Sequence, residues 1–463
     1  MLRRAVGARY VSSDVSSLKR YAEGSPPSLR NVTYRWRLES RYLPQALPGV
    51  IVRPSSTEQV SQVMQIANTH NVPVVPWGGG SNLVGATVAK GGWIVLDMNR
   101  LNRIKKVDDR HLCVVVEPAV KLARLQRVLG KYGLRHHTMA GSALWATVGG
   151  AIASDAHTNS FFRYGTVAKE ILELEFVTPA GVIIRTGAWR GAGLDLKGLL
   201  PRSEGTLGVI TAATIRIHRV PPFRRQMCFA FDTFSEAMEA NHQLWFGEHS
   251  AVSTIISFDR AERYPEFNPV GHGYDGWLAL TLEGTRAGVS NGMSVATRVV
   301  RAHGGLPLRQ KLVDSFDDWW TVFGRANLEA VRTGKVDKKT WRFAPNVWVP
   351  PGKVIKIREV FKESAVRHGL LYGGCSYRPT RITLGLQCDM SDDAQVENAG
   401  NALRDLKAAV HDAGGTLAGA HGAGLSYKEE VNEVLGDATI KLMKRIKAAL
   451  DPNGIMNPGK IFD

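Results

Sequence analysis

The sequence has few cysteines, and none of them is spaced for metal binding or dithiol chemistry. Its 463 residues include four cysteines, Cys113, Cys228, Cys375 and Cys388, and no CxxC pair. This spacing excludes a zinc ribbon and a dithiol redox motif, and it favours buried thiols in a reducing compartment. Long apolar runs are also absent, since no stretch approaches the roughly 18–20 residues that a membrane-spanning helix needs. We therefore do not expect the chain to span a membrane.

Acidic residues are scarce relative to basic ones. The chain carries 59 lysines and arginines against 42 aspartates and glutamates, a formal net charge of +17. A field of this sign favours anionic substrates, nucleic acid or anionic lipid, but it is also common in the mitochondrial matrix and identifies no partner. Two dense basic stretches, residues 335–342 and 441–447, could contact phosphate. Such runs are more often solvated helix faces.

The N-terminus has the composition of a mitochondrial targeting segment. Residues 1–13 include three arginines, several small residues and no acid. We predict that residues 1–20 are such a segment and that residues 21–44 form an extended arm. The alternative is a disordered basic tail. Residues 1–20 hold five basic residues and one acidic residue, so 54 basic and 41 acidic residues remain without them.

Beyond residue 45 the hydrophobic pattern predicts an alternation of short strands and helices, which is typical of α+β or α/β folds. Ser56 and Gln59 form a plausible capping box at the start of a helix. Pro221 and Pro222 follow the last strand of this region, and we place a domain boundary there. The predicted strands cover residues 72–75, 94–96, 114–116, 174–177, 182–186 and 209–217 in the first unit, and 277–282 and 382–387 in the second. The predicted helices cover residues 120–129, 235–245, 401–411 and 441–450.

The most informative stretch is a glycine-rich loop that directly follows the apolar run at residues 72–75. It reads Pro76-Trp-Gly-Gly-Gly-Ser-Asn-Leu-Val-Gly-Ala86. Three consecutive glycines after a strand let the backbone approach a ligand closely, with its N–H groups turned outward. The usual ligand of such a loop is a diphosphate. Taken alone, the run could equally be a plain tight turn.

Further segments accompany this loop in a fixed order. They are Val50–Val60, Gly141-Ser142 with Thr147–Ala153, Ser203–Thr211 and the tail Leu450–Lys460. The set resembles the flavoproteins of the vanillyl-alcohol oxidase superfamily, whose FAD-binding domain is of the p-cresol methylhydroxylase (PCMH) type. Within them the chain is most similar to the D-lactate, glycolate and D-2-hydroxyglutarate dehydrogenase branch. The resemblance is good over positions 45–220 and 414–463, and it is thin between positions 225 and 400.

The resemblance implies an α+β fold with a two-part PCMH-type FAD-binding domain over residues 45–222. An α/β substrate (cap) domain would follow over residues 223–440. Residues 441–463 would form a helix and tail that return to the FAD domain.

It also implies FAD as the cofactor. We expect FAD to be bound non-covalently, because the glycine loop has no histidine or cysteine and the spacing of His136, His137 and His157 matches no tether of the family. The implied FAD-binding residues are Pro76, Trp77, Gly78, Gly79, Gly80, Ser81, Asn82 and Leu83 at the diphosphate, Gly141, Ser142, Thr147, Gly149, Gly150 and Ala153 along the flavin and ribityl chain, Glu204, Val209 and Ile210 at the adenosine end, and Asn457 from the tail.

The chain departs from this family where its members carry a metal site. A GEHG-like motif becomes Gly419–Gly424, in which Ala420 replaces the ligating glutamate while His421 is kept. The stretch that usually supplies two histidine ligands appears as Gly374–Ile382 and contains no histidine. A divalent ion needs three or more protein donors, so we predict that the family's metal site is absent.

Some chemistry-bearing residues remain in these two segments. His421 could act as the general base for a substrate hydroxyl, or it could be a structural histidine in a glycine turn. Tyr377, Arg378 and Arg381 could bind an acidic substrate, since arginines suit carboxylates and phosphates. For either arginine alone, a surface charge is the commoner role.

Two functions follow from these observations. The first is an FAD-dependent mitochondrial dehydrogenase, in the matrix or on the matrix face of the inner membrane. It would oxidise a small anionic hydroxy acid or similar alcohol by hydride transfer to flavin N5, pass electrons to an unknown acceptor and work without the metal. The second is a catalytically silent flavoprotein homologue that serves as a scaffold in a mitochondrial assembly, possibly a ribonucleoprotein. The intact flavin loops favour the enzyme.

Overall fold

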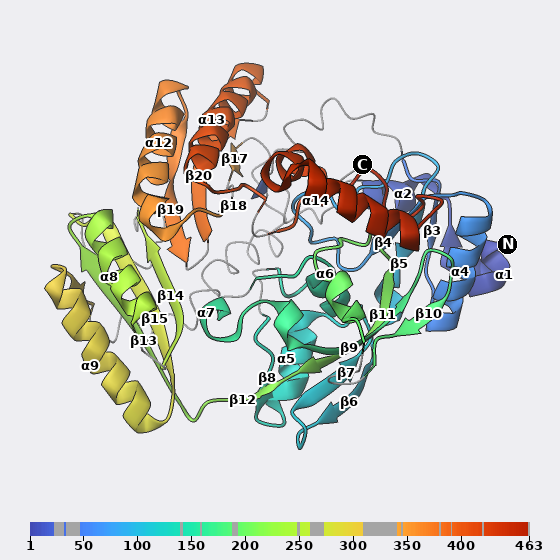
Figure 1. The fold of residues 1–463 in the computed structure, drawn as a ribbon, viewed down its shortest axis with the longest axis horizontal. Coiled ribbons are helices and arrows are strands. Elements are labelled where there is room, and N and C mark those ends of the chain that lie inside the picture. The colour runs from blue at the N-terminus through green and yellow to red at the C-terminus, as the bar shows by residue number, and fades with distance from the viewer. Residues whose placement is uncertain are drawn as a thin grey trace.

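The computed structural model describes residues 1–22, 32–33, 47–138, 142–157, 160–187, 193–247, 251–259, 273–308, 340–343, 346–378, 381–389, 391–418 and 421–461. They form two lobes side by side (Figure 1). The first lobe contains the N-terminal half of the chain, and helix α14 (Lys428–Leu450) crosses its upper surface. The second lobe is built on one large sheet, whose strands follow Phe223 in the sequence except for the short N-terminal strand β2 (Val32–Thr33).

The first lobe holds two sheets. The smaller has the order β1 (Val11–Ser12), β3 (Val50–Val52), β5 (Ile94–Asp97) and β4 (Val74–Trp77), with β3, β5 and β4 parallel. Helix α4 (Thr57–Thr69) covers it, and Ser56 caps that helix by accepting the backbone N–H of Gln59, which is half of the predicted capping box. The Gln59 side chain accepts the backbone N–H of Ser55 and not that of Ser56. The larger sheet has the order β10 (Ile183–Arg185), β9 (Ile171–Val177), β11 (Val209–Arg216), β7 (Cys113–Val116) and β6 (Ile104–Asp108).

Short elements connect these sheets to the rest of the first lobe. Strands β8 (Leu134–Arg135) and β12 (His218–Arg219) pair with each other. Helices α5 (Leu122–Gly130) and α6 (Val148–Ala153) contribute Leu125 and Ile152 to the apolar core beside the larger sheet. Helix α7 (Phe161–Tyr164) lies against strand β14 of the second lobe.

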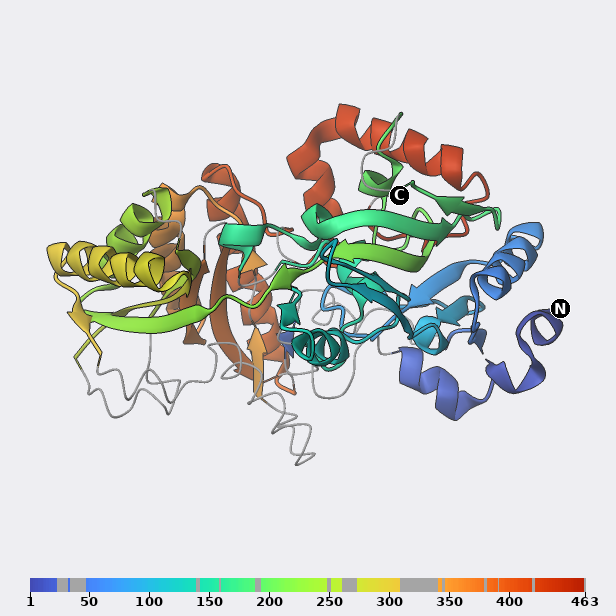
Figure 2. The ribbon, with the colours of Figure 1, turned by 90° about the horizontal axis from the view of Figure 1, so that it is seen from below.

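The second lobe contains a sheet of nine strands. Its main path runs β16 (Leu306–Pro307), β13 (Phe223–Phe231), β15 (Gly276–Gly284), β14 (Val252–Phe258), β19 (Leu371–Arg378), β20 (Arg381–Asp389), β17 (Thr340–Phe343) and β2 (Val32–Thr33), while β18 (Asn346–Val347) also pairs with β20. Four helices pack on this sheet: α8 (Phe234–Phe246), α9 (Arg286–Ala302), α12 (Val354–Arg367) and α13 (Asp393–Asp412). Figure 2 shows these helices gathered on one side of the sheet.

The N-terminal segment, positions 1–22, is folded onto the first lobe. Helix α1 (Leu2–Val6) packs on α4, β1 pairs with β3, and α2 (Val15–Ala22) brings Tyr21 into the core. Tyr21 is buried, donates to Asp97 at 2.6 Å and meets Trp77 edge-on at 4.9 Å. The targeting role of residues 1–20 stays a prediction, and the fold adds a structural role for the same residues. Of the expected extended arm, the described part includes β2, which adds to the sheet of the second lobe.

Candidate functional site

The glycine loop begins where β4 ends, and the close packing of its backbone requires glycine. A Cβ at Gly79 would lie 1.8 Å from the carbonyl oxygen of Trp145, and Gly80 has a φ of 64°. Within the described part of the chain, the backbone N–H groups of Gly79, Gly80 and Ser81 have no protein acceptor. Consecutive open amides in a turn form a concavity for an anion, which is the feature that the sequence predicted at this loop.

Other residues of the predicted diphosphate site support the loop from behind. The indole of Trp77 is buried, and a Cβ at Gly80 would lie 2.3 Å from it.

The turn after the glycines is closed by Asn82, whose side chain accepts the backbone N–H groups of Val84 and Ala86 at 3.0 and 2.8 Å. Gly78 has its carbonyl fixed by Asn99, and Pro76 packs on Gly205. Leu83 is half-buried.

The second predicted loop meets the first directly. Thr147 caps α6 by accepting the backbone N–H of Gly150, and a Cβ at Gly78 would lie 2.5 Å from the Thr147 hydroxyl. Gly149 packs against Pro118, whereas Gly150 is exposed and Ala153 is half-buried. Ser142 holds the turn by accepting backbone N–H groups of the two residues before Thr147. Gly141 lies outside the described residues.

The residues expected at the adenosine end use their side chains elsewhere. Val209 and Ile210 are buried in the apolar cores of the first lobe, so only their backbone remains for a ligand. The carboxylate of Glu204 accepts the backbone N–H groups of Ala423 and Gly424 at 2.6 and 3.0 Å. The Glu204 carboxylate is therefore engaged by the chain itself, and the expected place of Glu204 at the adenosine end stays a prediction.

Asn457 returns from the tail to these loops, as the sequence predicted. Its amide donates to the carbonyl oxygens of Ala86 and Glu204 at 2.9 and 2.8 Å. Its Oδ1 is buried and has no donor among the described residues. Such a buried acceptor is costly unless a partner supplies a hydrogen bond.

These features fit a bound dinucleotide. Open amides at Gly79–Ser81 suit a diphosphate, the small residues of two loops leave room beside the backbone, and Asn457 offers a buried acceptor for a hydroxyl. The segments come from distant parts of the chain, and hydrogen bonds and close backbone packing join them. Bridging contacts include the pairing of Val74 with Met456.

His421 lies in the turn that Glu204 holds, and two further basic side chains act on it. Burial, together with the charges of Arg381 and His157, lowers the pKa of His421 to about 3. Burial and the charge of Arg381 likewise lower the pKa of His157 to about 4. Arg381, which was predicted, and His157, which was not, therefore act electrostatically on His421. Both imidazoles are neutral at physiological pH and can accept a proton.

Arg378 and Arg381 face one another across the β19–β20 hairpin. They are register partners, so their side chains leave the same face of the sheet. The neighbouring pair, Tyr377 and Ile382, belongs to the apolar core on the opposite face. Tyr377 is buried edge-on to His242 at 5.8 Å. This packing removes Tyr377 from the predicted substrate site and leaves the two arginines.

His157 was missed because no motif assigns it. The available signal was its place in the sequence, four residues after Ala153, which ends the predicted second cofactor segment. Only the fold relates this position to His421. The nearby His136 and His137 are buried, and each has an Nε2 with no partner among the described residues.

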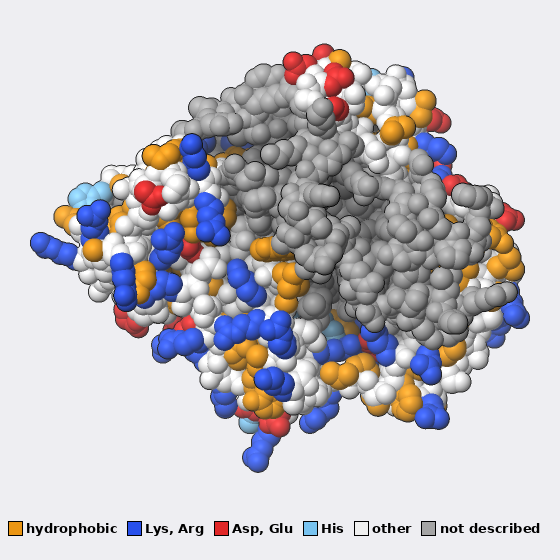
Figure 3. Space-filling view, turned by 180° about the vertical axis from the view of Figure 1, so that it is seen from behind, with side chains coloured by type: hydrophobic (Ala, Val, Ile, Leu, Met, Phe, Trp, Pro, Cys, Tyr) orange, Lys and Arg blue, Asp and Glu red, His pale blue; other side chains and the backbone are white. Residues whose placement is uncertain are grey.

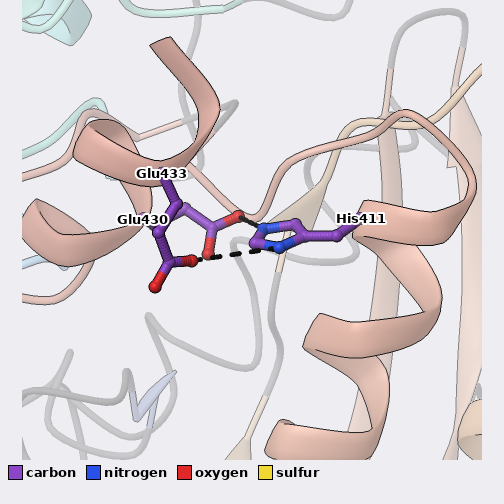
Figure 4. Close-up of side chains that lie close together, drawn as sticks. All are labelled: His411, Glu430 and Glu433. Atoms are coloured by element: carbon purple, nitrogen blue, oxygen red, sulfur yellow. Dashed lines mark hydrogen bonds and ion pairs between the residues drawn. The ribbon is translucent and has the colours of Figure 1, made fainter. Parts of the chain in front are cut away.

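One group of side chains in the described residues has the composition of a metal site. It contains His411 at the end of α13 with Glu430 and Glu433 at the start of α14 (Figure 4). His411 Nε2 is 2.7 Å from Glu430, and the ammonium of Lys407 is 2.6 Å from Glu433. Glu430 also accepts the backbone N–H of Leu417 at 3.0 Å. Because Lys407 and His411 already pair with both carboxylates, we interpret this group as an ion-pair network that joins α13 to α14.

The basic charge is spread over the surface. Figure 3 shows lysine and arginine side chains scattered across the described part of one face. On α14, Lys441, Lys444 and Arg445 are exposed, but Lys447 donates to the carbonyl oxygens of Thr206 and Met456 and has a structural role. Residues 335–339 of the other basic stretch lie outside the described residues. No described helix is both long and apolar enough to cross a bilayer.

Comparison with known proteins identifies relatives of both lobes. A family model described as an FAD binding domain matches residues 48–187, and one described as the C-terminal domain of FAD linked oxidases matches residues 220–461. The second match alone spans more than half of the chain.

Whole-chain relatives agree with these matches. The mitochondrial D-lactate dehydrogenase (cytochrome) of Arabidopsis thaliana is 28% identical over 441 residues, which cover 90% of this chain and 74% of that protein. The glycolate oxidase subunit GlcD of Bacillus subtilis is 25% identical, and the match covers 90% of each chain. The solved structure of p-cresol methylhydroxylase with substrate bound shares the fold, with a TM-score of 0.80 at 18% identity over 100% of this chain and 96% of that one.

Proposed function

Because the chain belongs to the family of FAD-linked oxidases, we propose that it oxidises a small anionic hydroxy acid or a similar alcohol. An FAD-binding domain and an FAD-linked oxidoreductase fold are its established features. The substrate class rests on one observation above all: the turn after His421 is bound to the cofactor loops through Glu204 and Val84, and Arg381 is near enough to lower the pKa of His421. The relatives named D-lactate dehydrogenase and glycolate oxidase subunit support the same class.

The first lobe would hold the cofactor through its backbone. The amides of Gly79, Gly80 and Ser81 would bind the diphosphate, and Asn457 Oδ1 would accept a hydroxyl of the cofactor. FAD, when bound without a covalent link, supplies the two-electron redox chemistry. The side chains of the chain then have to bind the substrate, orient it and remove its hydroxyl proton.

The second lobe would bind the anionic end of the substrate. Arg378 and Arg381 leave one face of the β19–β20 hairpin as a direct cross-strand pair. Two guanidinium groups on neighbouring strands suit an anion that can lie near both. A substrate carboxylate accepting hydrogen bonds from two guanidinium groups would meet this requirement.

His421 would act as the general base. An imidazole whose pKa is about 3 is neutral at physiological pH, so its unprotonated nitrogen can accept the hydroxyl proton. The positive charge of Arg381 opposes protonation of His421 in the resting site, while it favours binding of an anion. A substrate carboxylate would offset that charge and raise the basicity of His421 at the moment when a base is needed.

We propose that this reaction runs without the family's metal ion. Ile382 is part of the apolar core and offers no ligand, and Ala420 has none either. Cys375, the one soft donor in the equivalent stretch, is fully buried, and burial raises its pKa well above the ordinary value. A thiol of that kind is a poor metal ligand. Arg381 would supply the positive charge near the substrate.

The proposed location of the protein follows from its relatives. The Arabidopsis thaliana, Danio rerio and Kluyveromyces lactis D-lactate dehydrogenases are named as mitochondrial. We extend that location to this chain, in the matrix or on the matrix face of the inner membrane. Mitochondrial fractionation with matrix and inner-membrane markers would test it.

Anaerobic reduction of the purified flavoprotein tests the function directly. D-lactate, D-2-hydroxyglutarate and glycerol 3-phosphate are added separately, and the flavin absorbance at ~450 nm is followed. Bleaching by a hydroxy acid supports the proposal. A protein that binds FAD but is reduced by none of them, while dithionite still bleaches it, would instead support the catalytically silent scaffold.

A further inference from the structure

Glu204 stands at the junction of three chain segments, and its backbone is fixed on two sides. Its N–H donates to the carbonyl oxygen of Ala153 at 2.9 Å, and its own carbonyl oxygen accepts the amide of Asn457 at 2.8 Å. Its φ is 49°, in the left-handed region that a residue with a Cβ rarely adopts. The side chain is buried. The direction in which the carboxylate points is therefore set by the first lobe.

That carboxylate points at the backbone directly after His421. It accepts the N–H groups of Ala423 and Gly424 at 2.6 and 3.0 Å, although these residues lie far along the chain from it. Gly422 has a φ of 88°, and a Cβ there would lie 2.3 Å from Oε1 of Glu204. The fit leaves no room for a side chain between Glu204 and this turn. A carboxylate that accepts two adjacent amides fixes both the position and the twist of the segment.

The same turn is held from its other side by the loop after the glycines. Leu425 and Ser426 both donate their backbone N–H to the carbonyl oxygen of Val84, at 2.8 and 3.2 Å. Ile461 donates to the carbonyl oxygen of Gly424 at 3.1 Å. Residues 423–426 are thus bound to the first lobe, although they fall within the match to the C-terminal domain of the family.

Backbone strain is concentrated around this junction. Asp155, Arg202 and Glu204 all have positive φ values, of 45°, 63° and 49°. Asp155 holds Arg202 through an ion pair at 3.1 Å and accepts the backbone N–H of Ala168 at 2.9 Å. Such conformations cost roughly 1–3 kcal/mol each and persist where the surroundings determine them fully. Asp155 lies two residues before His157, and Glu204 binds the turn that follows His421.

We propose that Glu204 is a positioning residue, which holds the His421 turn against the cofactor-binding lobe and so orients the imidazole toward the substrate. This role rests on the proposed function of His421 as the base. It differs from a contact to adenosine, because both carboxylate oxygens are directed at backbone amides. It also explains why a glycine-rich turn, which would otherwise be mobile, can carry a base.

Hydrogen exchange measured by mass spectrometry tests the positioning without relying on turnover. The variants are E204Q, which keeps one acceptor oxygen, and E204A, which keeps none. We expect the amides of residues 423–424 to exchange about fivefold or more faster in E204Q, and faster again in E204A, because one or both hydrogen bonds are lost. The peptide that covers residues 74–84 should stay unchanged, as should the flavin content.

E430Q is the matched control. Glu430 is an equally buried glutamate that accepts a backbone N–H, that of Leu417 at 3.0 Å, but it belongs to the ion-pair network of α13 and α14. In E430Q, exchange at residues 423–424 and the rate of flavin reduction should both match the wild type. In E204Q the maximal reduction rate should fall about tenfold or more with little change in the substrate KM, because a displaced base affects chemistry more than binding.

The outcomes separate this inference from the proposed function. Wild-type exchange at residues 423–424 in both E204Q and E204A would overturn the positioning role, as would loss of FAD from E204Q. If E204Q exchanges faster but no hydroxy acid reduces the wild-type protein, Glu204 still holds the turn, and it is the proposed reaction that is overturned. If E204A does not fold, hydrogen exchange at residues 423–424 in E204Q alone tests the positioning role, since glutamine has nearly the same volume as glutamate.

Discussion

The two lobes differ in whether backbone groups or side chains form the proposed binding site. In the first lobe, the features that fit FAD are backbone amides at Gly79–Ser81 and close backbone packing between loops. In the second lobe and the turn that faces it, the features that fit a substrate are side chains: Arg378, Arg381 and His421. The first kind of site tolerates many sequences, provided that small residues remain. The second kind depends on single positions.

This difference accounts for what the chain keeps and what it lacks. The glycine loop is intact, and a buried tryptophan, Trp77, supports it from behind. The metal-ligand positions, by contrast, hold Ile382 and Ala420, and one substitution at each is enough to remove a ligand. We predict that the metal site is absent, in which case the flavin fold has been kept without that side-chain site. The following predictions test the contrast, in decreasing order of expected effect.

The replacement G79A should cause the largest effect, because loss of FAD removes all flavin chemistry. Its Cβ would overlap the Trp145 carbonyl oxygen at 1.8 Å, so the two cofactor loops must move apart. Overpacking of this kind costs about 1–3 kcal/mol, or roughly 10- to 100-fold in FAD affinity. The ratio of flavin to protein absorbance measures it. G130A, at a position with nothing within 4 Å, is the control and should stay yellow. A G79A protein with the FAD content of the wild type would contradict the proposal that close backbone packing in the first lobe is needed to bind FAD.

The variant H421Q should keep FAD and lose turnover. Removal of a general base slows the chemical step by roughly 10²–10⁴-fold. Stopped-flow reduction with the hydroxy acid that bleaches the wild type measures the rate. H411Q is the control, because His411 belongs to the Glu430 network. A wild-type reduction rate in H421Q would assign the base to another residue, of which His157 is the first candidate.

Acid should destabilise the first lobe through His136. Burial lowers the pKa of this histidine to about 4, and the charge of His218 acts in the same direction. The unfolded chain, with a pKa of about 6.5, binds more protons between these values, so stability is complete above about pH 6.5 and falls as the pH drops toward 4. The loss reaches about 3 kcal/mol.

Urea unfolding at a series of pH values measures this dependence. H136F should flatten the slope below pH 6.5, and H70F, at an exposed histidine, should leave it as in the wild type. A slope that H136F leaves unchanged would assign the acid sensitivity to other groups.

R381M should weaken substrate binding. Loss of a charged hydrogen bond to a carboxylate costs about 1.5–3 kcal/mol, so the substrate KM should rise roughly 10- to 100-fold. R381K should recover part of the affinity, because it keeps the charge without the planar geometry. R298M, on the exposed surface of α9, is the control. An unchanged KM in R381M would show that Arg381 does not bind the substrate anion.

Removal of metal ions should have the smallest effect. Dialysis against EDTA should change the rate of flavin reduction by less than about twofold, because the proposed site uses Arg381 in place of an ion. Metal analysis of the purified protein accompanies the assay. Loss of activity that Zn²⁺ or Mn²⁺ restores would show that other ligands have replaced those of the family.

The local features of the fold could be predicted from the sequence. The capped helix at Ser56, most strand positions and the glycine loop follow from side-chain size, hydrophobic period and capping chemistry, which act within a few residues. The order of the small-residue segments was sufficient to predict an FAD-binding fold. The α14 helix shows the limit of such reasoning: it begins at Lys428, with a kink at Gly436, because packing extends it beyond the predicted residues 441–450.

What each side chain contacts was set by tertiary packing. Tyr377 faces the core because strand alternation puts it opposite Arg378, and which face is buried depends on the helices that cover the sheet. Residues 1–22 pack on the first lobe although their composition resembles a targeting segment. Glu204 meets Ala423 and Gly424 from a distant part of the chain. Contacts between residues so far apart in the sequence form when whole elements pack together, so a local sequence pattern cannot predict them.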